Sequence, residues 1–291
     1  MPQAAPTRRT LANERPAEDT IVSVERAFAI VTLLADAMEG ASLAEIARHL
    51  GVNKAIASKL LATLEGVGIV WRDAVAQRYN LTYRVSNLGL RQLQRTRLLD
   101  QSAAVLKVLA EQTGELVRLA VVENGDRITW VYAVSGAKRT FHVDPNYTLE
   151  AYLHTTAIGK SWLATLPFET ALKYMLREGM KALTKHTKTT AKEVRAELEL
   201  TRKRGYATSF EESELGVIAI AAPIMVKTLT GETECVGAVS LAAPTNRMNP
   251  RELVACSPQL LATVERLARI WPLEPRTLRV FVEPQTASRL A

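Results

Sequence analysis

Two short helix patterns lie close together around one glycine in the stretch SLAEIARHLGVNKAIASKLLATLEGVGIV, which runs from Ser42 to Val70. Ser42 and Glu45 form an S-x-x-E capping box that opens the first pattern, and Asn53 is a good N-cap for the second. Gly51 supplies the turn between them. Helices this short are marginal on their own, so the pair must fold and act as a unit. The spacing predicts a helix-turn-helix.

A further helix and a hairpin flank this pair. Ser23 can cap a helix over the sequence VERAFAIVTLLADA that precedes it. After Gly68 come two strand-like runs, IVWRD and QRYNLTYRV, joined by residues 74–76. Three helices followed by a basic hairpin predict a winged helix-turn-helix over residues 20–85. Residues 1–19, rich in Pro, Ala and charge, predict a disordered arm.

Positive charge is concentrated in the predicted winged helix. The chain has a formal net charge of +7, and residues 46–84 carry six basic side chains against two acidic ones. Such an excess fits either an ordinary solvated face or a patch for an anionic partner such as nucleic acid. The 3.6-residue period of the second helix of the pair predicts an apolar side formed by Ile56, Leu60, Leu61 and Leu64. It leaves an outward face formed by Lys54, Ala55, Ser58, Lys59 and Ala62.

The second half of the chain has a different pattern. A leucine-bearing helical pattern runs from Ser86 to Gly114 with an interruption near residues 100–102, so residues 86–101 are expected to form a linker helix. Alternation around Asn124-Gly125 indicates a hairpin, and GVIAIAAPIMV and ECVGAVSLAAP are predicted as central strands. Helices are predicted at residues 157–166, 169–177, 190–204 and from Asn249 onward. This mixed order predicts an α+β domain over residues 102–272, followed by a tail of no clear pattern at residues 273–291.

Several functional classes are disfavoured. The longest uncharged apolar run, from Leu215 to Val226, is too short for a membrane span of about 20 residues. The first twenty residues lack the apolar core of a secretory signal. Cys235 and Cys256 cannot by themselves make a disulfide framework or a four-ligand metal cluster. We therefore expect a cytoplasmic protein with no membrane partner, no metal site and no cofactor.

Motifs of common enzyme families are also missing. The sequence has no G-x-S-x-G, no Gly-rich phosphate loop, no H-E-x-x-H and no Cys–His pairing in a supporting context. No catalytic residue is therefore predicted.

Six segments in one order resemble a known family. They are SVERAFAIVTLLAD, SLAEIARHLGVNKAIASKLLATLEGVG, LAEQTGELVRLAV, LHTTAIGKSWLA, RGYATSFEESELGVIAIAAPI and VGAVSLAAP. On these segments the chain resembles the IclR family of bacterial transcriptional regulators from Ser23 to Trp271. The resemblance implies an N-terminal winged helix-turn-helix joined to a GAF-like α+β domain that binds a small effector. It also implies dimers, which often pair into tetramers.

A recognition helix places its N-terminal residues near base edges in the major groove. Lys54, Ser58 and Lys59 on the outward face are therefore candidates for contacts with bases or phosphates. The family usually has Ser-Thr where this chain has Ala55-Ile56, so two hydroxyls that could bind phosphate are missing. We expect this departure to alter affinity or operator choice.

Arginines outside the recognition helix are further candidates. Arg72 and Arg78 on the hairpin could hold the DNA backbone or reach a minor groove, and Arg78 is preferred because it lies nearer the tip. Arg26 fits a phosphate contact and an ion pair with Glu25 or another acid equally well.

The resemblance also implies an effector site, formed by the start of the helix after the Leu-His motif and by the last strands. A helix N-terminus near Thr156 would suit a carboxylate, because it offers free N–H groups and a positive dipole end. Core packing is an equal alternative for the apolar positions, and the Ser240 hydroxyl needs either a ligand or a backbone partner. The matching positions are Ala157, Ile158, Gly159, Ser209, Val217, Ala219 and Ser240.

Departures at this site indicate the kind of effector. Many family members carry Cys at Ala219, an acidic residue at Ser209 and a second Ser at Ala242. These changes remove polar groups, so we expect a small organic acid that is bulkier and less polar, such as an aromatic one. His154 is expected to be structural and hydrogen-bonded within the fold. The acids of the run EESE, at positions 211, 212 and 214, are expected to be solvated.

Together these patterns predict a sequence-specific transcriptional regulator, repressor or activator, controlled by a small organic acid. Its partners would be double-stranded operator DNA and further copies of itself, as a homodimer or homotetramer. An architectural DNA-binding protein whose second domain only oligomerises is the alternative. An enzyme acting on a small carboxylic acid is less favoured.

Overall fold

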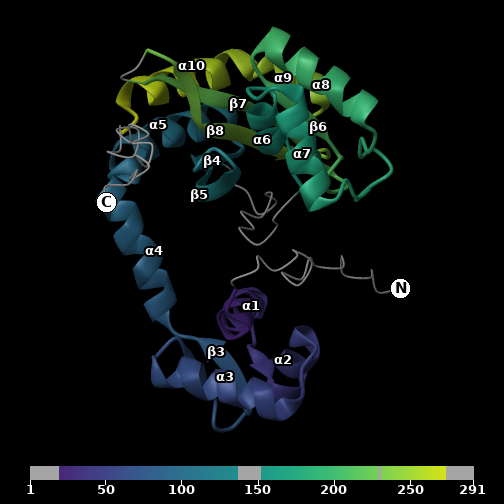
Figure 1. The fold of residues 1–291 in the computed structure, drawn as a ribbon. Coiled ribbons are helices and arrows are strands. Elements are labelled where there is room, and N and C mark those ends of the chain that lie inside the picture. The colour runs from purple at the N-terminus through teal and green to yellow at the C-terminus, as the bar shows by residue number, and fades with distance from the viewer. Residues whose placement is uncertain (1–19, 137–151, 229–230, 273–291) are drawn as a thin grey trace, which may run out of the picture. The chain divides into compact units, whose positions relative to one another are not determined.

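The computed structural model describes residues 20–136, 152–228 and 231–272, and it divides after Leu93 into two compact units (Figure 1). The predicted arm at residues 1–19 and the tail at residues 273–291 lie outside the described residues. Each unit is built around its own apolar core.

The first unit is a winged helix-turn-helix. It comprises α1 (Val22–Asp36), β1 (Ala41–Ser42), α2 (Leu43–Leu50), α3 (Lys54–Gly66), β2 (Val70–Arg72), β3 (Arg78–Leu81) and the start of α4 (Tyr83–Thr96). The strands form an antiparallel sheet in the order β1-β3-β2, in which Val70 lies opposite Leu81. Ile30, Ile46 and Leu61 bring the three helices together in the core. Burying these side chains stabilises helices that are too short to persist alone.

Local signals in the sequence set most helix ends of this unit. Ser42 and Glu45 form the predicted reciprocal capping box, and the Asn53 side chain accepts a hydrogen bond from the Ile56 N–H at 2.9 Å. Gly51 ends α2 in the left-handed conformation that favours glycine, with φ of 64°. The prediction for Ser23 is wrong, because α1 begins at Val22 with Ile21 at the N-cap position.

The phase of α3 differs from the prediction at one position. Ala57, Leu61 and Leu64 are buried at the spacing i, i+4, i+7, and Ile56 is 38% exposed. Successive helical residues are rotated by about 100°, so the face that buries Ala57 turns Ile56 toward solvent. The expectation that Ile56 belongs to the core is therefore wrong.

The second unit is an α+β domain built on a five-stranded antiparallel sheet in the order β5-β4-β8-β7-β6. Its strands are β4 (Leu116–Glu123), β5 (Arg127–Ser135), β6 (Ala207–Phe210), β7 (Val217–Lys227) and β8 (Thr233–Pro244). Its helices are α5 (Leu98–Thr113), α6 (Ala157–Leu163), α7 (Phe168–Glu178), α8 (Ala191–Arg204), α9 (Pro250–Ala255) and α10 (Ser257–Ile270). The break expected near residues 100–102 lies at Arg97, whose φ is 52°.

The two faces of this sheet carry different side chains. Val239 and Leu241 pack with α5 and α10 in the large core, whereas the alternate residue Ala238 packs with α6. Figure 1 shows α10 and α6 at the sheet formed by β7 and β8. The α6 side is rich in alanine, so small side chains line the sheet where the effector residues were predicted.

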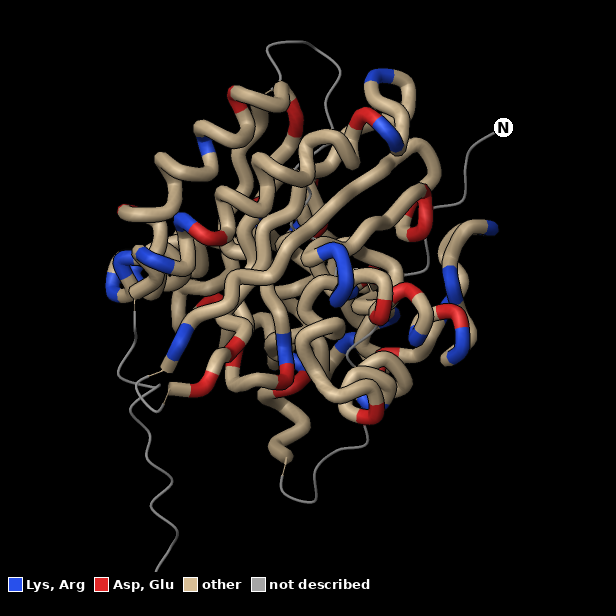
Figure 2. Tube along the Cα trace, turned by 90° about the horizontal axis from the view of Figure 1, so that it is seen from above, with Lys and Arg blue, Asp and Glu red and all other residues tan. Residues whose placement is uncertain are grey.

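Charged positions of both signs are distributed along the second unit (Figure 2). Figure 2 shows Lys and Arg positions interspersed with Asp and Glu positions over this unit. Between residues 46 and 84 of the first unit, by contrast, basic residues outnumber acidic ones. The charge pattern therefore directs the search for a nucleic-acid interface to the winged helix.

Candidate DNA interface and effector site

The solvent face of α3 carries the three predicted DNA-binding residues. Lys54, Ser58 and Lys59 are all exposed. Lys54 is the first residue of the helix, and the first turn contains no acid. A positive charge at the N-terminal end of a helix is not stabilised by the helix dipole. The Lys54 ammonium is therefore suited to binding an external anion such as a phosphate.

The wing is the hairpin formed by β2 and β3, and its two arginines, Arg72 and Arg78, make different contacts. The Arg78 guanidinium donates to the carbonyl oxygens of Glu39 at 3.0 Å and Gly40 at 2.9 Å, and lies 3.1 Å from the Glu45 carboxylate. These contacts join the wing to the start of α2. The hydrogen bonds that Ser42 donates, together with the charge of Arg78, lower the pKa of Glu45. Arg78 thus has a structural role of its own, which the sequence prediction did not include.

Arg72 is the more accessible arginine of the wing. It is exposed, donates to the side chain of Gln77 and lies 5.5 Å from the ring centroid of Tyr79. The turn at the tip is held by Asp73, which accepts hydrogen bonds from the N–H groups of Val75 and Ala76 at 2.7 and 2.9 Å. Arg72 therefore leads the hairpin candidates, while Arg26 lies partly buried on α1.

Two predicted effector residues have structural roles around the start of α6. The Thr156 hydroxyl caps the helix by accepting the Gly159 N–H at 3.0 Å. A Cβ at Gly159 would lie 2.3 Å from the Leu153 carbonyl oxygen, so only glycine fits there. The Ser209 hydroxyl donates to the Thr155 carbonyl oxygen at 2.7 Å. These groups hold the turn before α6, and a carboxylate would need another anchor.

The other predicted effector residues lie on the α6 face of the sheet. Ala157 and Ile158 pack with Ala219 in one apolar cluster. Ser240 is buried on β8 opposite Ala221, which belongs to the same cluster. Val217, at the start of β7, is paired with Pro244 and only partly buried.

Arg118 and Trp130 were missed by the sequence analysis. Arg118 on β4 lies directly opposite Ser240, so the two side chains share the α6 face. Its guanidinium carbon lies 4.6 Å from the ring centroid of Trp130, and Trp130 packs on the cluster that contains Ala157 and Ile158. The sequence did hold a signal, because Arg118 is a charged residue within the otherwise apolar run LVRLAVV.

A buried ionic network connects α6 with the segment that precedes β7. Lys160 is fully buried, and its ammonium lies 2.7 Å from Oε1 of Glu212. Lys188 reaches the same oxygen at 3.0 Å and Glu197 at 3.3 Å, and Glu197 also pairs with Arg204 at 2.8 Å. Burial lowers the pKa of Lys160 to about 8, although Glu212 acts to raise it. The network fixes α6 to the loop that precedes β7.

The acidic run before β7 is not uniformly solvated. Glu212 is buried, because Lys160 and Lys188 neutralise it, so the prediction for this residue is wrong. Glu211 is partly buried and accepts the Gly216 N–H at 2.9 Å, whereas Glu214 is exposed.

His154 has the structural role that was predicted. It is fully buried, and its Nε2 donates to the Lys181 carbonyl oxygen at 3.2 Å. Burial lowers the pKa of this imidazole, which favours the neutral form. In the described part of the chain, no group of three His, Cys, Asp or Glu residues could hold a metal ion. Nor is any helix of the described ranges both long and apolar enough to cross a membrane.

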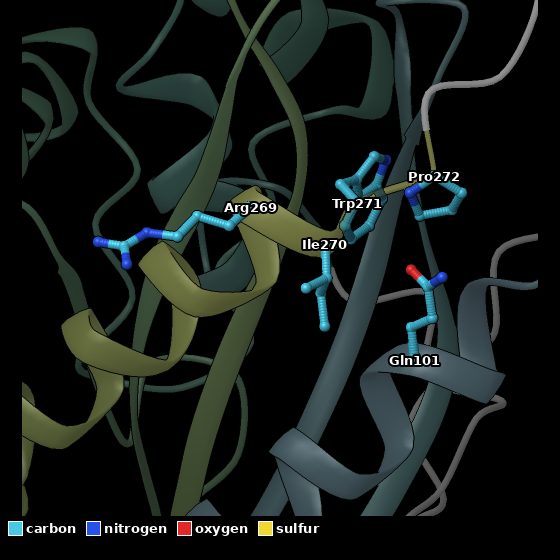
Figure 3. A pocket seen from close by; sticks show the side chains of 5 residues that line it. All are labelled: Gln101, Arg269, Ile270, Trp271 and Pro272. Atoms are coloured by element: carbon cyan, nitrogen blue, oxygen red, sulfur yellow. The ribbon is translucent and has the colours of Figure 1, made fainter.

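A separate open depression lies at the end of α10. It is lined by Gln101 of α5 and by residues 269–272, and Figure 3 shows Arg269 extending away from Gln101. Because α5 and α10 pack on the face of the sheet opposite α6, this depression contains none of the effector candidates.

An exposed basic recognition helix and a separate α+β unit define a winged helix DNA-binding protein, and comparisons with known proteins specify the family. Residues 23–74 match the IclR helix-turn-helix domain, and residues 90–269 match the bacterial transcriptional regulator IclR C-terminal domain. The chain belongs to the IclR family of bacterial transcriptional regulators.

Three similar proteins illustrate the match. A glycerol operon regulatory protein from Streptomyces coelicolor is 32% identical, covering 86% of this chain and 94% of the relative. The crystal structure of an IclR transcriptional regulator from Alicyclobacillus acidocaldarius is 25% identical, covers 86% of this chain and 99% of its own, and has a TM-score of 0.74. A double mutant of the PobR inducer-binding domain from Acinetobacter, in complex with 3-hydroxybenzoic acid, is 28% identical. It covers 59% of this chain and 98% of its own, with a TM-score of 0.51.

Proposed function

We propose that this regulator binds an operator through α3 and the wing, and that an aromatic carboxylic acid bound on the α6 face of the sheet controls it. The observation that carries the effector part is the position of Arg118 over Trp130 and opposite Ser240. In this assignment residues 20–85 bind DNA, residues 86–101 link the domains and residues 102–272 bind the effector.

The DNA contacts divide by their chemistry. Lys54, Ser58 and Lys59 would enter the major groove with the N-terminal half of α3. Arg72 would hold the backbone beside it or reach a minor groove. Arg26 and Arg78 are weaker candidates, because the first is partly buried and the second is bound within the domain.

The effector contacts follow from what an aromatic acid needs. A carboxylate is best matched by a guanidinium, which Arg118 supplies from the strand position opposite Ser240. The aromatic ring needs an apolar wall, for which Trp130, Ala157 and Ile158 are suited. The 3-hydroxybenzoic acid bound by the PobR inducer-binding domain supports this class of ligand.

Self-association is supported by an exposed apolar stripe formed by α1 and its N-cap residue. Ile21, Val24 and Phe28 are 68, 51 and 65% exposed at helical spacing, on the side away from the buried Ile30. A second copy of this chain would cover the stripe, and a homodimer would present two recognition helices to two half-sites. Two such dimers could pair into a homotetramer. We place the protein in the cytoplasm and assign it no catalytic step, since its relatives are named as regulators.

The test begins with operator selection from random double-stranded DNA, followed by fluorescence anisotropy with the selected and a scrambled duplex. Specific binding that weakens roughly 10³-fold between about 50 and 200 mM salt is expected for several phosphate contacts. Equal affinity for both duplexes would favour the architectural alternative. Benzoate and 3-hydroxybenzoate are then titrated, and a regulator of the proposed kind changes its operator affinity.

A further inference from the structure

Ile56 is an apolar residue on the solvent face of the recognition helix. The core of the winged helix takes Ala57, Leu61 and Leu64 instead, and leaves Ile56 38% exposed. Ile56 lies three residues before Lys59, so the two side chains are neighbours on the helix surface. A single exposed apolar residue is ordinary on a protein surface, so the argument depends on its position.

Ile56 is the third residue of its helix, a position where three other capped helices of this chain carry glutamate. In α2, α8 and α9 the third helical residue is Glu45, Glu193 or Glu252, and each closes a capping box. Asn53 caps α3 in the same way, yet the third residue is Ile56. A carboxylate here would repel phosphate, while isoleucine gives up the reciprocal cap bond and presents an apolar surface beside Lys59.

A cationic face with one apolar side chain matches a specific feature of DNA. In the major groove, base pairs present hydrogen-bonding groups and one apolar group, the 5-methyl of thymine. Lys54 and Lys59 can neutralise phosphates or bind guanine, but neither lysine ammonium favours a methyl group. We propose that Ile56 contacts the 5-methyl group of a thymine in each operator half-site and so selects T at that position. This inference rests on the proposed function, because it requires α3 to lie in the major groove.

The test replaces single thymines of the selected operator by deoxyuridine, which removes only the 5-methyl group. Burying a methyl group is worth roughly fourfold in Kd. We expect the wild-type protein to lose about three- to tenfold in affinity at one thymine of each half-site. Ile56→Ala should lose less than about 1.5-fold on the same change, and Ile56→Val should lie between the two.

The controls separate this contact from general damage. Met38→Ala removes a fully exposed apolar side chain outside α3 and should keep the wild-type sensitivity to deoxyuridine. Thermal unfolding checks that the Ile56 variants are folded, which is expected because the side chain is exposed. Wild-type affinity that changes less than twofold at every thymine overturns the proposal. So does an Ile56→Ala variant that keeps full sensitivity. A wild-type protein that selects no sequence at all refutes operator recognition itself, and this proposal with it.

Discussion

The guanidinium of Arg118 lies 4.6 Å from the centre of the Trp130 ring, although the two residues are on different strands of the hairpin. A cation over an indole face is attracted to the ring electrons, and the contact holds both side chains in one orientation. Because Arg118 also faces Ser240 across the β4–β8 pair, a charge, a hydroxyl and an aromatic ring meet on the α6 side of the sheet.

Replacing Arg118 should remove the response to aromatic acids. In Arg118→Gln the charge is lost while the stem of the side chain remains, so we expect at least a tenfold rise in the Kd of 3-hydroxybenzoate, with operator binding unchanged. Isothermal calorimetry measures the Kd of 3-hydroxybenzoate. Fluorescence anisotropy of the labelled operator measures DNA binding with and without this ligand. Arg127→Gln, on the exposed end of β5, is the matched control. An Arg118 variant that responds normally would refute the assigned anchor.

Lys59 should contribute to DNA affinity and not to effector affinity. Removing one phosphate contact in Lys59→Ala is expected to weaken operator binding several-fold and to reduce the slope of log K against log salt by about 1. Anisotropy titrations at four salt concentrations would give that slope. Lys107→Ala removes the same charge from α5, a helix of the second unit, and should leave the slope unchanged. Equal slopes for wild type and Lys59→Ala would exclude the contact.

Local signals explain why much of this fold is predictable. The caps at Ser42, Asn53, Thr190 and Asn249 depend on residues two or three positions away, and all four are present in the structure. Ile56 was misplaced because its side chain and that of Ala57 differ by one helical step, and only the packed core decides which of them is buried.

Pairing over long sequence distances explains what was missed. Glu212 is buried because Lys160 lies beside it, 52 residues earlier in the chain. Arg118 and Ser240 are brought together by the pairing of β4 with β8, which no short motif encodes. Glycine is needed at position 159 because the backbone of Leu153 packs against it and leaves no room for a Cβ. A family motif contains this glycine but does not show the contact that requires it.

The buried pair of Lys160 and Glu212 should be important for stability. Removing one partner of a buried ion pair typically costs about 3–5 kcal/mol. In Lys160→Met the second cation, Lys188, still neutralises Glu212, so we expect about 3 kcal/mol. Urea unfolding at pH 7 measures the loss, and Lys173→Met on the exposed side of α7 serves as control. A variant within about 0.5 kcal/mol of wild type would contradict the burial of this charge.

The apolar stripe formed by α1 and its N-cap residue should govern assembly. Phe28→Asp places a charge among Ile21 and Val24, so we expect the protein to shift toward monomers and to lose affinity for an operator with two half-sites. Light scattering after size exclusion reports the mass. Met38→Asp adds the same charge at a fully exposed position outside the stripe and should stay associated. If Phe28→Asp and wild type have the same mass, the stripe is not the interface.

Acid should destabilise the second unit partly through Glu197. Burial acts to raise the pKa of this carboxyl, but the charges of Lys160, Lys188 and Arg204 outweigh it and the pKa is lowered in the folded protein. A lowered pKa in the fold means that the unfolded chain binds the proton more tightly. The contribution of Glu197 to stability is therefore fully present above its ordinary pKa of 4.5 and is lost as the pH falls below that value.

Glu197→Gln tests this linkage directly. The variant should be less stable than wild type at pH 7, and the difference in the free energy of unfolding should shrink as the pH is lowered from about 5 to 3. Glu199→Gln changes an exposed carboxylate of the same helix, and its difference from wild type should stay small throughout. A difference between Glu197→Gln and wild type that stays constant with pH would refute this linkage, because the stability lost in the variant would then come from contacts that do not depend on the charge of the carboxylate.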